Sequence, residues 1–115
     1  MEAWAAAKHA VISGATGLNA DTANGEFEQV EREVYRKVGD LDRWLFVDVN
    51  NKWIVGNTAN KDVRKTKSSG FAYLVAAAGR MPPPAGPSVW KVSGGNGWVE
   101  QTLQVGLLSA AQVRW

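Results

Sequence analysis

The chain of 115 residues contains no cysteine and only one histidine. Without cysteine it can form neither disulfides nor thiolate metal sites, so the redox state of its compartment is left open. His9 by itself cannot build a histidine-rich zinc site. The sequence therefore predicts no metal and no cofactor.

Long apolar runs are missing as well. No stretch approaches the roughly 18 apolar residues that a membrane-spanning helix requires, so no membrane partner is expected. The first 15 residues lack the basic start and the clean apolar stretch of a signal peptide. The chain has no Asn-x-Ser/Thr sequon, which agrees with an intracellular protein.

The side chains that most covalent catalysts use are equally scarce. One histidine and no cysteine leave no nucleophile–base pair of the usual kinds. Two carboxylates in different environments are the arrangement that remains open. The acids concerned gather mostly on a segment that reads as a solvated hairpin: Glu26, Glu28, Glu31, Glu33 and Asp48. The sequence therefore favours a protein that is not an enzyme.

Tryptophan, in contrast, occurs six times. Four of the six flank two polar turns, in the segments 44–53 and 90–98, and each segment predicts a β-hairpin with a tryptophan on either arm. In the first hairpin the alternation places Trp44 and Phe46 on one face of the strand. Leu45 and Val47 then share the other face.

Similar short runs of β-branched and aromatic residues, separated by turn signals, continue along the chain. They lie at 9–14, 26–30, 33–38, 43–49, 52–56, 71–77, 88–92, 97–101 and 102–105. The run 71–77 is also compatible with a short helix, but its aromatic and branched residues favour a strand. We expect an all-β fold, a compact small barrel or sandwich of seven or eight short, mostly antiparallel strands joined by hairpins. Residues 57–69 are polar, lack apolar periodicity and predict a long loop.

The chain is long enough for one domain, and we expect a single β domain over residues 1–115. Its core should span about residues 9–106. Residues 1–8 and 107–115 are then terminal extensions.

Several of these segments also resemble a known kind of module. Asn24-Gly-Glu-Phe, Val34-Tyr, Trp44-Leu, Trp53-Ile-Val, Ala72-Tyr, Trp90-Lys-Val and Gly97-Trp-Val-Glu-Gln follow one another in this order. The series resembles small, tryptophan-rich all-β modules of uncharacterised proteins of single-celled eukaryotes, which occur as repeats or as appendages of larger proteins. The resemblance covers roughly residues 10 to 105 and departs at Glu33, where those modules have proline. It implies an all-β interaction module and supplies no site residues.

The tryptophans are the first candidates for a site, because exposed aromatic faces bind sugars, peptides or bases. The candidates are Trp44, Trp53, Trp90 and Trp98. The alternative is that they form the core, since tryptophan is usually highly buried and aromatic pairs stabilise hairpins.

A second candidate is the basic segment 61–67, with Lys61, Arg64, Lys65 and Lys67 and one acid. On a flexible loop these bases could bind a polyanion in a salt-dependent manner. The alternative is an ordinary solvated loop.

The leading hypothesis from the sequence is a non-catalytic binding or assembly module. It would recognise an extended partner, either a protein segment or a glycan, through exposed aromatic residues. One alternative is a structural spacer or a self-association domain that pairs through a sheet edge or through Trp4 and Trp115. A further alternative is polyanion binding by residues 61–67.

Overall fold

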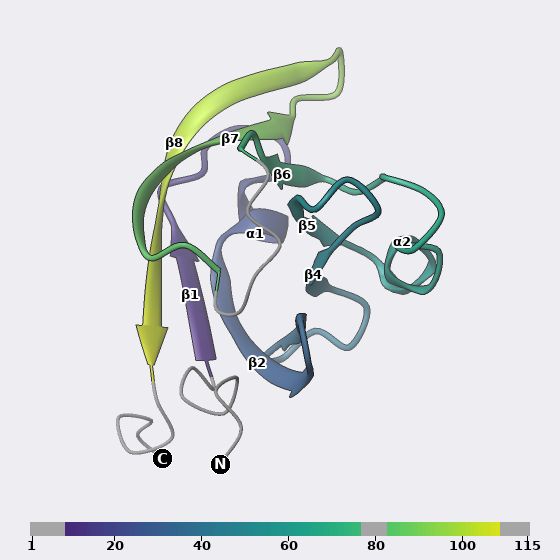
Figure 1. The fold of residues 1–115 in the computed structure, drawn as a ribbon. Coiled ribbons are helices and arrows are strands. Elements are labelled where there is room, and N and C mark those ends of the chain that lie inside the picture. The colour runs from purple at the N-terminus through teal and green to yellow at the C-terminus, as the bar shows by residue number, and fades with distance from the viewer. Residues whose placement is uncertain (1–8, 77–82, 109–115) are drawn as a thin grey trace.

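Eight antiparallel strands close into a small barrel, in which each strand pairs with the one before it and the last pairs with the first (Figure 1). The computed structural model describes residues 9–76 and 83–108. The strands are β1 (His9–Ser13), β2 (Gly25–Glu31), β3 (Val34–Lys37), β4 (Trp44–Val47), β5 (Trp53–Gly56), β6 (Ala72–Leu74), β7 (Gly86–Ser93) and β8 (Trp98–Leu108). Two short helices, α1 (Ala20–Ala23) and α2 (Thr58–Asp62), lie in the connections. The predicted all-β fold is confirmed. Of the two expected architectures, a barrel or a sandwich, the structure has the barrel.

The barrel interior is filled by alternate residues of the strands, as the pleat of a strand requires. Leu45, Trp53 and Trp90 are fully buried there. Tyr35 meets Trp53 edge to face, with ring centroids 6.0 Å apart. Large aromatic side chains therefore occupy much of the space inside this small barrel.

The outer face of β3, β4 and β5 carries a second apolar cluster. Val34, Phe46 and Ile54 point away from the interior and are nevertheless buried, and Trp44 and Tyr73 pack against them. We call these five residues the outer cluster. Both faces of β4 and β5 are thus apolar, which is the pattern of strands covered on both sides.

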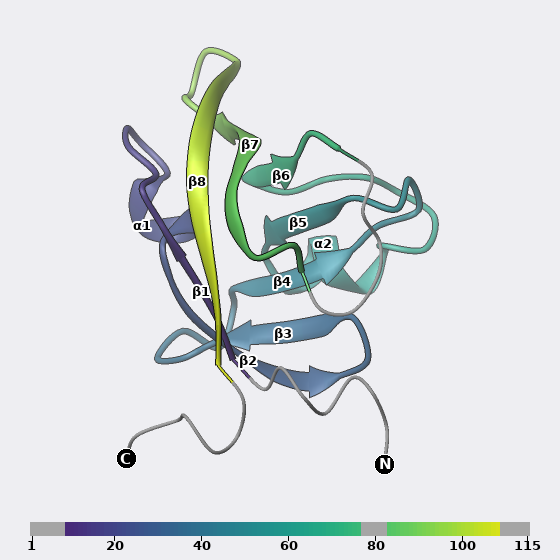
Figure 2. The ribbon, with the colours of Figure 1, turned by 60° about the vertical axis from the view of Figure 1, so that its left-hand side comes forward.

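Residues 57–71 provide the cover, and here the prediction of a long loop over 57–69 is wrong in part. The segment begins with α2, which lies outside the barrel beside β4 and β5 (Figures 1 and 2). The side chain of Asn57 accepts a hydrogen bond from the N–H of Asn60, and the Asn60 side chain accepts one from the N–H of Asn57. This reciprocal cap explains why a short helix starts at Thr58.

Asp42, in the turn before β4, ties the start of α2 to the barrel. Its carboxylate accepts a hydrogen bond of 3.0 Å from the N–H of Thr58. Hydrogen bonding by Thr58, together with the charge of Arg43, holds the pKa of Asp42 below its usual range.

Neither of the described helices has the length and apolar character needed to span a bilayer.

The C-terminal strand is longer than the sequence predicts. The runs 97–101 and 102–105 belong to one strand, β8, which also includes Leu107 and Leu108. Its second half pairs with β1 and closes the barrel, while its first half pairs with β7 and extends to a turn that stands above the other strands (Figure 2). Trp98 begins this strand and therefore lies at the projecting end.

The turn between β2 and β3 contains a residue with a left-handed backbone. Glu33 has φ 61°, a region that proline cannot reach because its ring holds φ near −65°. The proline of the resembling modules would therefore require a different turn at this position.

Candidate functional site

The structure separates the four candidate tryptophans into three environments. Trp53 and Trp90 are 0% exposed inside the barrel and offer no surface to a partner. Trp44 is half-buried in the outer cluster. Trp98 is 49% exposed. Of the four, only Trp98 presents a large part of its ring to solvent.

Trp44 has a visible structural role. Its Nε1–H donates a hydrogen bond of 2.9 Å to Oγ1 of Thr58. The Lys61 ammonium lies 4.4 Å from the centroid of its ring, and the Arg36 guanidinium lies 5.7 Å away. Its contacts with Thr58 and Lys61 engage the indole in holding α2 against the barrel.

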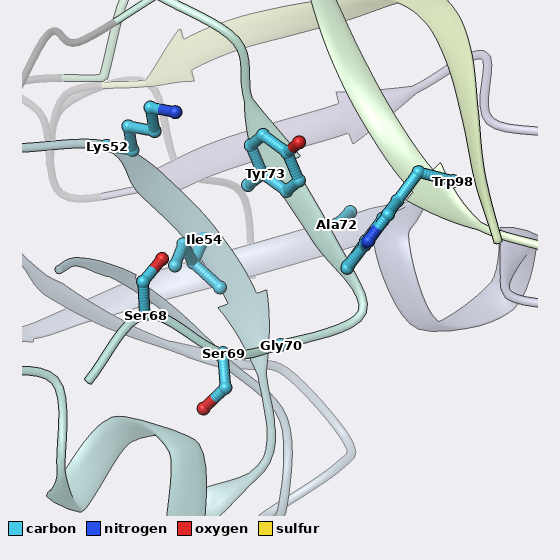
Figure 3. A pocket seen from close by; sticks show the side chains of 8 residues that line it. All are labelled: Lys52, Ile54, Ser68, Ser69, Gly70, Ala72, Tyr73 and Trp98. Atoms are coloured by element: carbon cyan, nitrogen blue, oxygen red, sulfur yellow. The ribbon is translucent and has the colours of Figure 1, made fainter. Parts of the chain in front are cut away.

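Trp98 and Tyr73 together form one side of a groove of about 230 Å³ on the outer face of the barrel (Figure 3). Their ring centroids are 5.0 Å apart with an interplanar angle of 75°, the edge-to-face arrangement that aromatic pairs prefer. Tyr73 fixes the orientation of the exposed indole. The Lys52 ammonium lies 5.2 Å from the centroid of the Tyr73 ring, at the same groove.

The rest of this groove, which we call the Trp98 groove, combines an apolar floor with polar walls. Ile54 and Ala72 line it from β5 and β6, and Ser68 and Ser69 line it from the returning end of the 57–71 segment (Figure 3). Gly70 lets that segment approach β5 closely, because a Cβ there would lie 2.3 Å from Ile54 Cγ2. Bulk at Gly70 would push this wall away from the strand.

The basic segment does not form one patch of four free cations. The Lys61 ammonium lies 2.8 Å from the Asp62 carboxylate, besides its contact with Trp44. The Arg64 guanidinium lies 3.3 Å from the Glu31 carboxylate and donates to the carbonyl of Lys61. Lys65 and Lys67, in contrast, are exposed. Two of the four predicted bases therefore attach the segment to the barrel or stabilise its own fold.

A wider groove of about 560 Å³ lies between the β2–β3 turn, the β4–β5 turn and the Arg64–Lys65 end of the covering segment. Asp48 lines it, with one carboxylate oxygen accepting from the N–H groups of Asn50 and Lys52. The other oxygen is buried and has no hydrogen-bond partner among the described residues. It is therefore an unused hydrogen-bond acceptor that is closed off from solvent.

His9 is a feature that sequence reasoning set aside. It is buried on the outer face of β1, and its Nδ1 contacts the Glu26 carboxylate. Its Nε2 lies 3.6 Å from the Glu28 carboxylate. In the sequence, the acidic run on β2 could have indicated a partner for His9, because Glu26 and Glu28 alternate with Phe27 and so share the outer face.

Over residues 9–76 and 83–108, no group of three or more potential metal-ligating side chains is found.

Trp4 and Trp115, the predicted self-association residues, lie outside the described residues.

Comparison with known proteins adds nothing to the geometry, since no family model, curated protein or solved structure matches the chain.

Proposed function

We propose that this chain is a non-catalytic binding module that holds an extended partner, a protein segment or a glycan, in the Trp98 groove. The observation that carries the proposal is the exposed, oriented indole of Trp98 beside Tyr73. Rigid aromatic side chains supply large contact area at little entropic cost, and they dominate the affinity of many binding surfaces.

The surroundings of Trp98 support this role. The exposed ring of Trp98 gives contact area, while Ser68, Ser69 and Lys52 add polar groups that can orient a ligand. The groove is open and lies on a face of the sheet. An extended partner can therefore cross it without entering the barrel.

A titration followed by two-dimensional amide NMR tests the proposal. Pools of oligosaccharides and of peptides are added to isotope-labelled protein, and the indole N–H signal of Trp98 reports on the groove. We expect this signal to shift saturably with one pool, while the signals of the buried Trp53 and Trp90 stay nearly unchanged. The Trp98→Ala variant has no indole signal at this site, so its backbone amides report instead, and they should no longer shift saturably with that pool. Saturable amide shifts that survive in this variant would contradict the assignment to this groove.

Self-association is a second candidate, favoured by the apolar end of the β7–β8 hairpin. Trp98 and Val99 are each 49% exposed there, and Leu18 nearby is 74% exposed. Because Trp98 and Val99 lie on opposite faces of the strand, both faces of this hairpin end expose apolar side chains that can pair with a second copy of the chain. Sedimentation velocity over a hundredfold range of concentration would then show a rising mass, and the Val99→Ser variant would suppress it.

Polyanion binding by residues 61–67 has less support. Lys61 and Arg64 are engaged within the fold, which leaves Lys65 and Lys67 as the accessible cations. Shifts confined to the amides of this segment, and only at low salt, would nevertheless favour it.

A further inference from the structure

The charge around the Trp98 groove points to the chemistry of its ligand. Among the eight described residues that line it, Lys52 is the only one charged at neutral pH, and none is acidic. Lys67 directly precedes the lining Ser68, and Lys91 pairs with Tyr73 across β6 and β7. Lys91 itself is paired across β7 and β8 with the acidic Glu100, which lies outside the lining of the groove. The groove itself therefore complements an anion.

The hydrogen-bonding groups of the groove favour the same kind of ligand. Oγ of Ser69 accepts a hydrogen bond of 3.1 Å from the side-chain amide of Asn60. Because that bond uses an acceptor site of the hydroxyl, its proton can still be donated to a ligand. Ser68 is exposed and adds a second hydroxyl. Hydroxyl and ammonium groups together match a ligand rich in hydroxyls that also carries an acid.

The backbone beneath the groove argues for a glycan over a peptide strand. Ile54 pairs with Tyr73, and Tyr73 pairs with Lys91, so the strands under the groove are joined in one continuous ladder. The N–H of Phe71 also donates to the carbonyl of Val55. A peptide that binds by strand addition needs a free sheet edge, and the described strands of this face offer none.

The aromatic wall suits a sugar ring. One face of a pyranose presents C–H groups that pack on an indole by dispersion and by attraction to its π face. Trp98 has an exposed indole whose orientation is fixed by Tyr73. Ser68 and Ser69 line the same groove as Trp98 and add hydroxyl groups to it (Figure 3).

We infer that the ligand of the Trp98 groove is an acidic glycan, whose sugar ring stacks on Trp98 and whose carboxylate or sulfate group pairs with Lys52. The inference rests on the proposed binding function and adds the class of ligand to it.

The test is a calorimetric and NMR titration of the full chain with four probes. Tetragalacturonate and a heparin tetrasaccharide are acidic glycans, the methyl ester of tetragalacturonate is the uncharged counterpart, and tetraglutamate is an acidic chain without sugar rings. Trp98→Ala removes the stacking surface, and Lys52→Met removes the charge while keeping the stem. Lys65→Met is the matched control, an exposed lysine at the other groove.

We expect at least one acidic glycan to bind and to shift the Trp98 indole signal. The loss of one exposed ion pair should weaken the binding of the acidic glycan to Lys52→Met about fivefold. The uncharged methyl ester should bind the unaltered chain at least about fivefold more weakly than tetragalacturonate does. Trp98→Ala should lose at least about tenfold in affinity, and Lys65→Met should bind like the unaltered chain.

The opposite results overturn the inference in distinguishable ways. If the ester binds as tightly as the acid, the acidic class is wrong and the binding function stands. If tetraglutamate binds as tightly as the glycans, or a peptide pool alone moves Trp98, the ligand is not a glycan. If no glycan and no peptide moves the Trp98 signal, the inference and the proposed function fail together.

Discussion

The indole N–H of Trp44 donates its hydrogen bond to Oγ1 of Thr58 over 2.9 Å, and this contact joins strand β4 to helix α2. It lies on the outer face of the barrel, where α2 packs beside β4 and β5 and Gly70 approaches Ile54 closely. The tryptophan that begins the first hairpin is thus engaged in attaching the cover of the outer cluster.

A double-mutant cycle measures that attachment. Trp44→Phe removes the donor and Thr58→Val removes the acceptor, and we expect a coupling energy of about 0.5–1.5 kcal/mol in the free energy of unfolding. Urea denaturation of the four proteins provides the values. Thr66→Val serves as the control partner, since the Thr66 hydroxyl bonds within its own turn, and it should be additive with Trp44→Phe. Additivity of Thr58→Val itself would contradict the role of the bond.

Matched replacements in the second hairpin separate a buried tryptophan from an exposed one. Trp90→Phe leaves a cavity and removes the hydrogen bond from the indole N–H to Ser88. We therefore expect the free energy of unfolding to fall by about 1–3 kcal/mol. Trp98→Phe should change it by no more than about 0.5 kcal/mol. Thermal and urea denaturation check both values. Equal losses would mean that Trp98 is part of the core.

The first hairpin, with Trp44 and Trp53, shows how much of the fold the sequence alone predicts. The alternation within Trp44–Val47 predicts correctly which residues share a face. It does not predict which face is exposed, because β4 and β5 are apolar on both sides. That answer depends on the 57–71 segment folding back over β4 and β5, a tertiary contact made by polar residues without apolar periodicity.

The closure of the barrel was beyond sequence reasoning for a related reason. Pairing of His9–Ser13 with the far end of β8 joins segments almost a whole chain apart, and no local pattern distinguishes it from a sandwich edge. The candidate site was predicted only in part. Trp98 was among four equivalent tryptophans, whereas its neighbours Tyr73, Ser68, Ser69 and Lys52 were not singled out, since only the fold brings them together.

The turn at Glu33 gives a prediction about backbone conformation. At φ 61° a proline cannot be accommodated, so Glu33→Pro should destabilise the protein by more than about 1 kcal/mol. Asparagine tolerates this region better than glutamate, so Glu33→Asn should be neutral or slightly stabilising. Thermal denaturation of both variants is the measurement. A stable proline variant would show that the turn adopts another conformation.

The turn between β4 and β5 depends on the carboxylate of Asp48. Asp48→Ala removes the acceptor of two backbone N–H groups, and we expect it to cost about 1–3 kcal/mol in the free energy of unfolding. Asp48→Asn keeps one oxygen for both N–H groups, so it should retain most of the stability when measured by urea denaturation. An asparagine variant as unstable as the alanine variant would mean that the negative charge matters more than these bonds.

Tyr35 makes the stability depend on pH in the alkaline range. Its phenol is fully buried beside Trp53, and burial raises its pKa above the ordinary value of 10.0. Above pH 10 the unfolded chain therefore releases the phenol proton while the folded chain keeps it, which lowers the free energy of unfolding as the pH rises.

Lys37 acts in the opposite direction, because burial lowers its pKa below 10.5 and the folded chain releases that proton first. A comparison with Tyr35→Phe isolates the phenol, since both proteins keep Lys37. We expect the free energy of unfolding of the unaltered chain to fall by about 1 kcal/mol more than that of Tyr35→Phe between about pH 10 and 11, measured by urea denaturation at each pH. Parallel pH profiles would mean that the phenol reaches water in the folded protein, and the barrel interior around Trp53 would then be open at Tyr35.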